Sequence, residues 1–406
     1  MTASPRGTTA GRAARAAAIA VLAFAAALPA AASAAVPREF WGVVPINDLS
    51  AAEFDQMGAG NVGTLRQIVL WPAIERADNQ FDWSYTDFLV ANAAENDIRI
   101  QPFLYATPNW VKGVDCHGLT DELCQRVPPV SPKARGQWQD FLRAIVGRYG
   151  SSGSFWSDST DAYAPPYEPI TSWQIWNEPS SQTYYRPKPK VKGYAKLVKI
   201  SHDAITDVDP AAQIVLAGVF PEPEGGKKFR LEPYLSALYR VRGLAKHFDA
   251  AALHPYARTI NGLKQQIKNV RSVMRRAGVA KKQLWITEVG WGSDPPVANR
   301  PLIKGEDGQK ELLEDSFDLL ASNSDSWNLA GVLWYSWRDP GYGYENCPFC
   351  SSSGLLKENG NPKPSWNSFV RITGGQPEAP PDPSPPSDPG TPPPAEPPPV
   401  IPPILP

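Results

Sequence analysis

Residues 172–179 read SWQIWNEP, an apolar run that ends in Asn177 and Glu178 and is followed by a proline. A short apolar run bounded by such a residue is typical of a buried strand. Glu178 then lies where the strand gives way to a loop. A carboxylate at such a place is costly to desolvate unless it has a task. The stretch therefore predicts both a strand and a functional acid at its end.

The same arrangement occurs again at residues 284–291, which read LWITEVGW, with Glu288 at the end of the apolar run. Two carboxylates at strand ends are what a retaining glycosidase needs. One acid protonates the leaving oxygen and the other carboxylate attacks the sugar. We therefore take Glu178 and Glu288 as the candidate catalytic pair.

Further apolar runs of the same kind extend along the chain on both sides of these two stretches. Continuous apolar runs are typical of parallel strands that are buried on both faces. The eight runs cover residues 41–45, 62–69, 98–105, 170–176, 213–219, 248–254, 283–287 and 330–337. Helical periodicity between them covers residues 83–95, 134–149, 192–207, 263–277 and 310–323.

This alternation predicts an α/β fold, a (β/α)8 TIM barrel that forms a single catalytic domain over residues 37–373. An open doubly wound sheet is the alternative architecture. It would be expected to carry a glycine-rich phosphate-binding turn after its first strand. Residues 45–48 read PIND and contain no glycine, which favours the barrel.

The two ends of the chain differ from this middle part. Arginines precede an apolar stretch at residues 16–28, and residues 32–34 read ASA, so residues 1–35 are expected to be a secretory signal. A membrane anchor is the alternative, but the stretch is shorter than the roughly 20 residues that a spanning helix needs. Residues 374–406 are expected to be a proline-rich disordered tail, because 16 of the last 30 residues are proline. We expect the protein to be secreted or associated with the cell envelope.

The charge balance says little about the fold but bears on partners. The 406 residues carry a formal net charge of −1, and lysine and arginine form no block large enough for a nucleic-acid surface. We therefore expect a carbohydrate substrate, no nucleic-acid partner, and no membrane contact beyond the export signal. We also expect a monomer.

Four cysteines fall into two local pairs, Cys116 with Cys124 and Cys347 with Cys350. Export favours disulfides, and each would stiffen a loop near the cleft. Zinc binding is the alternative for residues 347–350, which read CPFC, but a second pair of ligands is missing.

Polar and aromatic residues gather at the carboxyl ends of the predicted strands, where barrel active sites lie. Arg66 lies in the second strand, His254 ends the sixth and Tyr256 follows it, and Trp334 lies in the eighth. Together with the two glutamates, this set resembles clan A of the glycoside hydrolases. In that clan the acid/base follows an asparagine at the end of the fourth strand, and the nucleophile ends the seventh. The resemblance covers about residues 40–372.

The resemblance implies roles that are also chemically reasonable. Glu178 would be the general acid/base, kept protonated because a second carboxylate nearby disfavours another negative charge. Glu288 would be the ionised nucleophile, held in orientation by Tyr256 and kept ionised by Arg66. Asn177 would donate its amide to the sugar 2-hydroxyl.

Aromatic residues near the strand ends are candidates for sugar stacking, because sugars present apolar C–H faces to aromatic rings. Trp334 is expected to form the floor of the cleaved subsite. His254, Trp291 and Trp110 are further candidates for substrate contact, and Trp71 and Trp337 for neighbouring subsites; each could equally be a core residue.

The third predicted strand continues into residues 103–110, FLYATPNW. Some clan families, including family 5, have a histidine there, whereas the Thr-Pro-x-Trp turn is more similar to family 39 and its bacterial relatives. This resemblance leaves β-xylosides, uronic-acid glycosides and exopolysaccharides open as substrates.

The sequence thus predicts a glycosidase that acts by double displacement without a metal or an organic cofactor. A transglycosylase that uses the same intermediate is one alternative. A non-catalytic polysaccharide-binding barrel is another, although such a protein would be expected to have lost one of the two acids.

Overall fold

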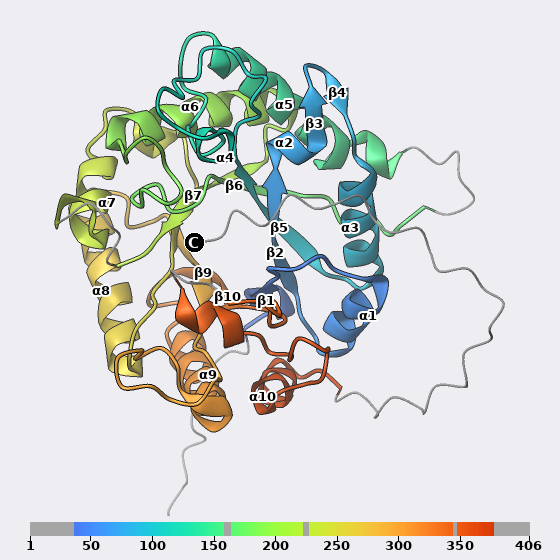
Figure 1. Ribbon diagram of the computed structural model, residues 1–406, viewed down its shortest axis with the longest axis vertical. Coiled ribbons are helices and arrows are strands. Elements are labelled where there is room, and N and C mark those ends of the chain that lie inside the picture. Colours follow the sequence, from blue (N-terminus) through green and yellow to red (C-terminus); the bar gives the residue numbers. More distant parts are fainter. Residues whose placement is uncertain (1–35, 158–163, 222–226, 344–346, 377–406) are drawn as a thin grey trace, which may run out of the picture. The chain divides into compact units, whose positions relative to one another are not determined.

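The computed structural model describes residues 36–157, 164–221, 227–343 and 347–376. Within them, eight parallel strands close into a barrel in the order β1-β10-β9-β8-β7-β6-β5-β2 (Figure 1). The strands are β1 (Trp41–Val44), β2 (Thr64–Leu70), β5 (Arg99–Tyr105), β6 (Ser172–Ile175), β7 (Gln213–Val219), β8 (Ala250–Leu253), β9 (Gln283–Val289) and β10 (Leu329–Tyr335). The predicted (β/α)8 fold is therefore confirmed, and the closed barrel excludes the open doubly wound sheet.

The barrel strands agree with the eight predicted runs to within two residues at either end. The agreement has a simple cause, because most strand residues are buried whichever face of the sheet they lie on. The barrel interior is filled by side chains such as Trp285 of β9. A Cβ atom on Gly331 of β10 would lie 2.3 Å from the Trp285 ring, so this strand needs a glycine opposite the indole.

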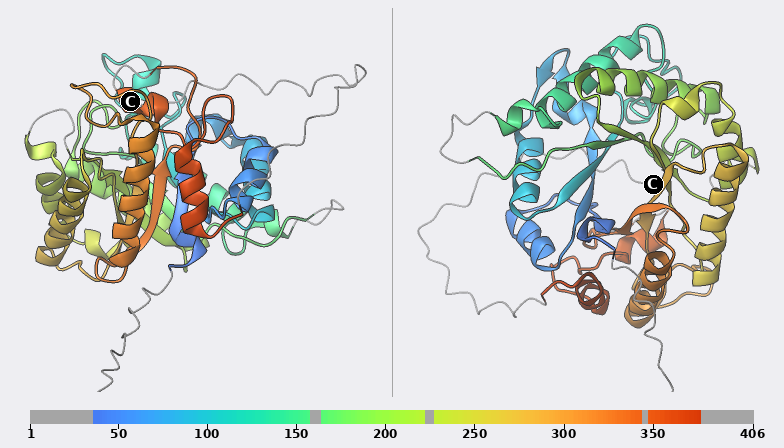
Figure 2. Two further views of the ribbon diagram at one scale, coloured as in Figure 1. Left: turned by 90° about the horizontal axis from the view of Figure 1, so that it is seen from below. Right: turned by 180° about the vertical axis from the view of Figure 1, so that it is seen from behind.

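Helices surround the strands, as Figure 1 shows along the barrel and Figure 2 shows from below and from behind. The main helices are α1 (Ala51–Ala59), α3 (Ser84–Glu95), α5 (Ala134–Tyr149), α6 (Val191–Val208), α7 (Leu231–Tyr239), α8 (Ile260–Arg276), α9 (Gly305–Ser322) and α10 (Pro364–Thr373). Short helical turns α2 (Trp71–Ile74) and α4 (Asp121–Cys124) and the hairpin β3 (Glu75–Ala77) with β4 (Gln80–Phe81) lie in the loops.

Helix α6 illustrates how the helices are held against the barrel. Its buried residues recur with the spacing of a helical face and include Tyr194, Leu197, Val198 and Ile205. The Tyr194 hydroxyl donates to the carbonyl of Ile175 at 2.9 Å and accepts from the amide of Ala217. One buried hydroxyl thus joins α6 to β6 and β7.

Both predicted disulfides are present, Cys116–Cys124 and Cys347–Cys350. The zinc alternative for residues 347–350 is therefore wrong, because its two thiols are bonded to each other. None of the helices in the described ranges is both long and apolar enough to cross a membrane.

The expected signal at residues 1–35 and most of the expected tail lie outside the described residues. Of the tail, the structure describes only residues 374–376. Gly375 donates its amide to Val370 of α10, and Gln376 donates to Ala59 of α1. These residues therefore pack on the barrel domain.

Candidate active site

Glu178 and Glu288 meet at the carboxyl end of the barrel although their strands are not neighbours. Glu178 follows β6, the fourth barrel strand along the chain, and Glu288 lies at the end of β9, the seventh. Each residue is only 8% exposed. A carboxylate oxygen of each glutamate and a ring nitrogen of His254 all lie within 4.8 Å of one another. Closure of the barrel thus brings two nearly buried acids together.

The backbone that carries Glu178 leaves the extended conformation before reaching it. Trp176 has a φ of 73° and Glu178 a φ of 36°, in the left-handed region that residues other than glycine rarely adopt. The Trp176 amide donates to Leu104, and its indole Nε1 donates to Tyr184 at 2.8 Å. These two bonds hold the turn that directs Glu178 toward Glu288.

Arg66 of β2 is completely buried and connects three side chains of the site. Its guanidinium donates to Glu288 Oε1 at 2.7 Å, Asn177 Oδ1 at 2.9 Å and Gln174 Oε1 at 2.8 Å. The guanidinium also lies over the Phe103 ring, with Cζ 4.1 Å from the ring centre. A planar cation with several donors suits this position, because it satisfies three acceptors from separate points at once.

Tyr256 supplies the second donor to Glu288. Its hydroxyl donates to Glu288 Oε2 at 2.7 Å, so each carboxylate oxygen of Glu288 accepts a hydrogen bond. Burial raises the pKa of Glu288, whereas the Arg66 charge and the Tyr256 hydroxyl act in the opposite direction. The same burial, next to the Glu288 charge, raises the pKa of Tyr256 well above its usual value and keeps the phenol protonated as a donor.

His254 lies between the two glutamates. Its Nδ1 is 2.7 Å from Glu178 Oε1 and 3.4 Å from Glu288 Oε2. Burial, with the Arg66 charge nearby, lowers the pKa of His254 well below its usual value, so the ring is neutral. We assign its proton to Nδ1, because that nitrogen faces the carboxylates.

Gly218 of β7 makes room for this histidine. A Cβ atom at Gly218 would lie 2.0 Å from His254 Nε2, far inside van der Waals contact. Sequence reasoning missed this residue, although a glycine within a predicted strand often signals the close approach of another group.

The three groups Glu178, His254 and Glu288 have the donor atoms of a metal site but are already paired with protein groups. Both oxygens of Glu288 accept hydrogen bonds, one of them from a full positive charge. A divalent cation here would have to displace the Tyr256 donor and lie near the Arg66 guanidinium. The arrangement is therefore better suited to acid–base chemistry than to metal binding.

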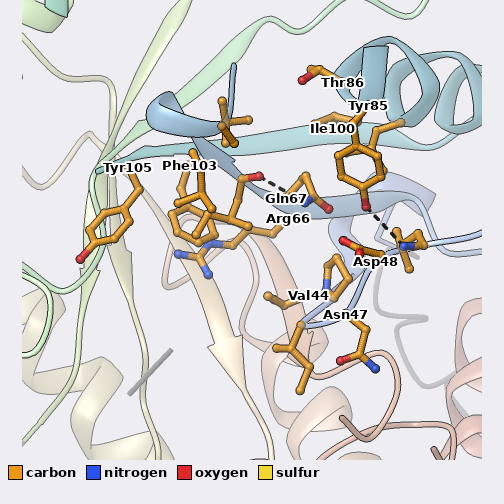
Figure 3. A pocket seen from close by; sticks show the side chains of 18 of the residues that line it. Val44, Asn47, Asp48, Arg66, Gln67, Tyr85, Thr86, Ile100, Phe103 and Tyr105 are labelled. Atoms are coloured by element: carbon orange, nitrogen blue, oxygen red, sulfur yellow. Dashed lines mark hydrogen bonds between the residues drawn. The ribbon is translucent and has the colours of Figure 1, made fainter. Parts of the chain in front are cut away.

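A cavity of about 1070 Å³, which also reaches between the barrel and the helices α3 and α5, opens beside Glu288. Arg66, Asn177, Glu288, Tyr184 and Tyr335 line its inner end. From there the lining continues along the loop after β1, where Asn47 and Asp48 lie, and reaches Tyr85 of α3 (Figure 3). The Tyr85 hydroxyl accepts a hydrogen bond from the Leu49 amide and so joins the β1 loop to α3.

Most of the predicted stacking tryptophans are core residues instead. Trp334 is completely buried, donates to the Ser353 carbonyl at 3.0 Å and packs between Trp291 and Phe317. The expectation that it forms the sugar floor is therefore wrong. Trp291 is also completely buried, with its indole bound to the Ala257 carbonyl.

The remaining tryptophans do not line the cavity either. Trp110 is half-buried, lies edge-on to the buried Trp71, and donates to the Glu75 carbonyl at 2.9 Å. Trp337 is buried and donates to Glu53. Trp71, Trp110 and Trp337 pack the loops around the barrel mouth, so the prediction of direct sugar stacking is not supported for any of the three.

The aromatic side chain that faces the cavity from β10 is the neighbour of Trp334. Tyr335 lines the cavity and lies near the Tyr256 ring, with 6.3 Å between ring centres. Successive side chains of a strand point to opposite faces, so Trp334 points to the core and Tyr335, the next residue, points to the cavity.

A second missed residue is Gln174, whose buried amide links Arg66 to the Leu216 carbonyl. A polar side chain inside an apolar run was its sequence signal.

The Cys347–Cys350 disulfide also lies near the site. It brackets Phe349, whose ring centre is 4.9 Å from that of Tyr256. The loop therefore packs against the residue that orients Glu288. The structure gives the Cys116–Cys124 loop no such contact among the residues of the site described above.

Comparison with known families agrees with this geometry. The sequence profile of the family described as "Glycosyl hydrolase catalytic core" matches residues 156–369, just over half of the chain and including both glutamates. The chain belongs to this glycosyl hydrolase family. It is therefore a glycosidase by family. No protein of curated function matches this glycosyl hydrolase in sequence.

Solved structures of glycoside hydrolases share its fold. A family 39 glycoside hydrolase from the gut symbiont Bacteroides cellulosilyticus WH2 has 18% identity and a TM-score of 0.58, over 83% of this chain and 64% of that chain. A monomeric beta-xylosidase from Caulobacter crescentus CB15 has 15% identity and a TM-score of 0.60, over 83% and 68%. Xylanase 10B from Thermotoga petrophila RKU-1 has 15% identity and a TM-score of 0.55, over 82% and 93%.

These similarities confirm the predicted resemblance to clan A. The glycosyl hydrolase spans slightly less than two thirds of the family 39 structure, so that protein contains a substantial part that this chain does not match. At such low identity the structures establish the fold.

Proposed function

We propose that this glycosyl hydrolase is a retaining enzyme that cleaves O-glycosidic bonds by double displacement. The observation that carries the proposal is the short distance between the two acids, whose oxygens approach within 4.8 Å. Retaining enzymes hold their carboxyl groups about 5–5.5 Å apart, whereas inverting enzymes need roughly 6.5–9.5 Å to admit a water molecule. The present spacing supports direct attack by a carboxylate.

The hydrogen bonds favour Glu288 as the nucleophile. It accepts from a guanidinium and a phenol, which stabilise its ionised form, and Glu178 lies against the neutral His254 ring. In the first step Glu288 attacks the anomeric carbon while Glu178 gives its proton to the departing oxygen. In the second, Glu178 takes a proton from water, which attacks the anomeric carbon and releases Glu288.

Asn177 and Arg66 complete this reaction centre. Asn177 Oδ1 accepts from Arg66, so its amide nitrogen is free to turn its two protons toward the sugar side of the site. A donor at this place would bond the sugar 2-hydroxyl, an interaction that strengthens as the transition state develops. Arg66 acts indirectly, because it orients Asn177 and Glu288 together.

The cavity supports an oligosaccharide or polysaccharide as the substrate. Its lining continues from Glu288 past Asn47 and Asp48 to Tyr85, so it extends beyond the site of cleavage and leaves room for more than one sugar. Two of the similar structures are a beta-xylosidase and a xylanase in complex with xylobiose, so β-xylosides are the first substrates to test.

We also infer that the protein works outside the cytoplasm. The two disulfides support this, because such bonds persist in oxidising compartments and are rare in reducing ones. The arginine-flanked apolar stretch before residue 35 would direct the export.

The proposal is tested with paired variants, Glu288→Ala and Glu178→Ala, on an aryl glycoside that the wild type cleaves. Azide is expected to restore turnover in both, with an inverted glycosyl azide from Glu288→Ala and a retained one from Glu178→Ala. Glu306→Ala is the matched control, because this glutamate lies on α9 in an exposed ion pair with Lys357.

A 2-fluoro glycoside should label Glu288, detected by mass spectrometry of the digested protein. Normal activity in Glu288→Ala, or an inverted product from the wild type, would overturn the mechanism. Labelling of Glu178 instead would reverse the two roles.

A further inference from the structure

Two of the four histidines of the chain meet on the outside of the barrel. His202 and Asp203 lie on α6, and His247 directly follows the short helical turn η4 (Leu244–Lys246). One ligand atom from each of the three side chains lies within 4.8 Å of the others. We propose that this cluster is a binding site for a divalent transition metal, with Zn²⁺ as the best match.

The orientation of His247 is the first argument. Its Nδ1 lies 2.7 Å from the Gly243 carbonyl oxygen, which can only accept, so Nδ1 carries the ring proton. In the neutral ring the lone pair is then on Nε2, which lies 3.9 Å from Asp203 Oδ1. Metal-bound histidines are commonly oriented in this way, with the nitrogen away from the metal donating to a carbonyl.

The position of Asp203 is the second argument. Its Oδ1 lies 3.1 Å from His202 Nδ1 and 3.9 Å from His247 Nε2. A proton on His202 Nδ1 makes the first contact a hydrogen bond, and a metal ion bound between the three side chains would take the place of that proton. In tetrahedral zinc sites, with bonds of about 2.0–2.2 Å, two ligand atoms lie roughly 3.3 Å apart. The two separations from Asp203 need shifts of less than about 1 Å to reach this geometry, and the ligand nitrogens of the two histidines lie within 4.8 Å of each other.

The donor set selects the class of metal. Two imidazoles and one carboxylate suit Zn²⁺, Ni²⁺ or Cu²⁺, whereas Mg²⁺ and Ca²⁺ prefer oxygen ligands. The side chains of His202 and His247 are 26% and 25% exposed and that of Asp203 is 59% exposed. Water can therefore provide a fourth ligand and the metal can enter from solvent.

The position in the fold indicates a structural role. Helix α6 leads from the carboxyl end of β6 toward the opposite end of the barrel, and η4 precedes β8, so the cluster lies away from the catalytic pair. Lys199 of α6 already joins the same two segments by donating to the Arg242 carbonyl. A bound metal would clamp α6 to the segment that enters β8. A structural metal here would be an addition to the metal-free protein that the sequence predicts, and it would take no part in the proposed reaction.

Calorimetric titration with Zn²⁺ tests the proposal on the full chain, prepared without a histidine tag and treated with a chelator. We expect one Zn²⁺ per chain and a higher Tm with Zn²⁺ than with chelator. His202→Ala and His247→Ala should each weaken binding at least tenfold and abolish the Tm increase. His117→Ala is the matched control, because this histidine lies in the Cys116–Cys124 loop, and it should bind as the wild type does.

Each variant is also measured in chelator, where an unchanged Tm shows that the fold is intact. X-ray absorption should show two nitrogen ligands at about 2.0 Å from the zinc. No binding by the wild type would overturn the proposal. Zinc binding that survives in the His202→Ala/His247→Ala double variant would also overturn it. If Glu178→Gln then removes the surviving binding, the metal is bound at the catalytic pair instead.

Discussion

Arg66 Nη1 lies 2.7 Å from Glu288 Oε1, in an ion pair whose arginine is completely inaccessible to solvent. The two residues are on the second and seventh barrel strands, so the pair forms across the barrel. A buried ion pair is expensive to break, because the remaining charge is left without a partner. The pair therefore links the stability of the barrel to the state of the proposed nucleophile.

Replacing Arg66 is expected to reduce both activity and stability. Arg66→Ala should lower the free energy of unfolding by about 3–5 kcal/mol, because Glu288 stays buried without its cation. Arg66→Lys should be more stable than Arg66→Ala but should remain impaired in kcat, because an ammonium cannot satisfy Glu288, Asn177 and Gln174 with one planar group. Denaturant unfolding and steady-state kinetics check this. Equal activity in Arg66→Lys and the wild type would contradict the conclusion that Arg66 must bond Glu288, Asn177 and Gln174 together.

Removing the Tyr256 hydroxyl is expected to shift the acidic limb of the pH profile. Burial raises the pKa of Glu288, and the Tyr256 hydrogen bond opposes that rise. Loss of the donor in Tyr256→Phe disfavours the ionised carboxylate, so the pKa rises further and activity at low pH falls. A hydrogen bond to a charged group contributes about 1.5 kcal/mol, which corresponds to a shift of about one pH unit.

The measurement is kcat/KM against pH for the wild type and Tyr256→Phe. Tyr342→Phe is a control, because Tyr342 also lines the cavity but is an exposed residue of the loop after β10. A limb that moves to lower pH in Tyr256→Phe would contradict the assignment of the donor.

A methyl group at Gly218 is expected to inactivate the enzyme through His254. Gly218→Ala would place its Cβ 2.0 Å from His254 Nε2 and push the ring away from Glu178 and Glu288. We expect kcat to fall by about 10²-fold or more, since a misplacement of 1 Å can cost that much. The matched change is Gly136→Ala in α5, where a Cβ meets no atom within 4 Å. It should leave kcat unchanged and stabilise the helix by up to about 1 kcal/mol.

Substitutions of the neighbouring residues Trp334 and Tyr335 should have different effects, the first mainly on stability and the second mainly on substrate binding. Trp334→Ala empties a core position and should cost about 3–5 kcal/mol of unfolding free energy. Tyr335→Ala removes a cavity wall and should lower kcat/KM about tenfold, the equivalent of about 1.4 kcal/mol of lost contact, with a smaller effect on stability. Thermal unfolding and kinetics on the same substrate distinguish them. The reverse pattern would restore Trp334 as the sugar platform.

Opening the Cys347–Cys350 disulfide should affect activity more than opening Cys116–Cys124. The first holds Phe349 against Tyr256, which bonds Glu288. The Cys347→Ser/Cys350→Ser variant should therefore lose activity several-fold, while Cys116→Ser/Cys124→Ser should retain it. Equal losses in both variants would argue that the disulfides act only on general stability.

The barrel and the positions of its two acids could be predicted because their signals are local. A strand buried on both faces leaves a continuous apolar run, and a glutamate that closes such a run must lie at the strand end. Glu178 and Glu288 were predicted in this way, and their placement on the fourth and seventh strands followed from counting runs. The bonds from Arg66 and Tyr256 to Glu288 agree with the roles that the clan A resemblance implied.

Other features of the site left weaker signals. Trp334 and Tyr335 are both aromatic residues at the end of a predicted strand, and composition alone does not say which of them faces outward. Gly218 and His254 are 36 positions apart and lie in contact only because β7 and β8 are neighbours in the barrel. The meeting of His202, Asp203 and His247 depends in the same way on α6 lying beside η4.

Consecutive residues determine local burial and turn chemistry. The apolar runs and the acids that end them therefore predict a glycosidase barrel before any contact is known. Consecutive residues do not determine which side chains share a cavity, which pack the core, or how far apart the carboxylates lie. These features depend on strand register and on closure of the barrel, and those bring together residues that are more than a hundred positions apart in the chain.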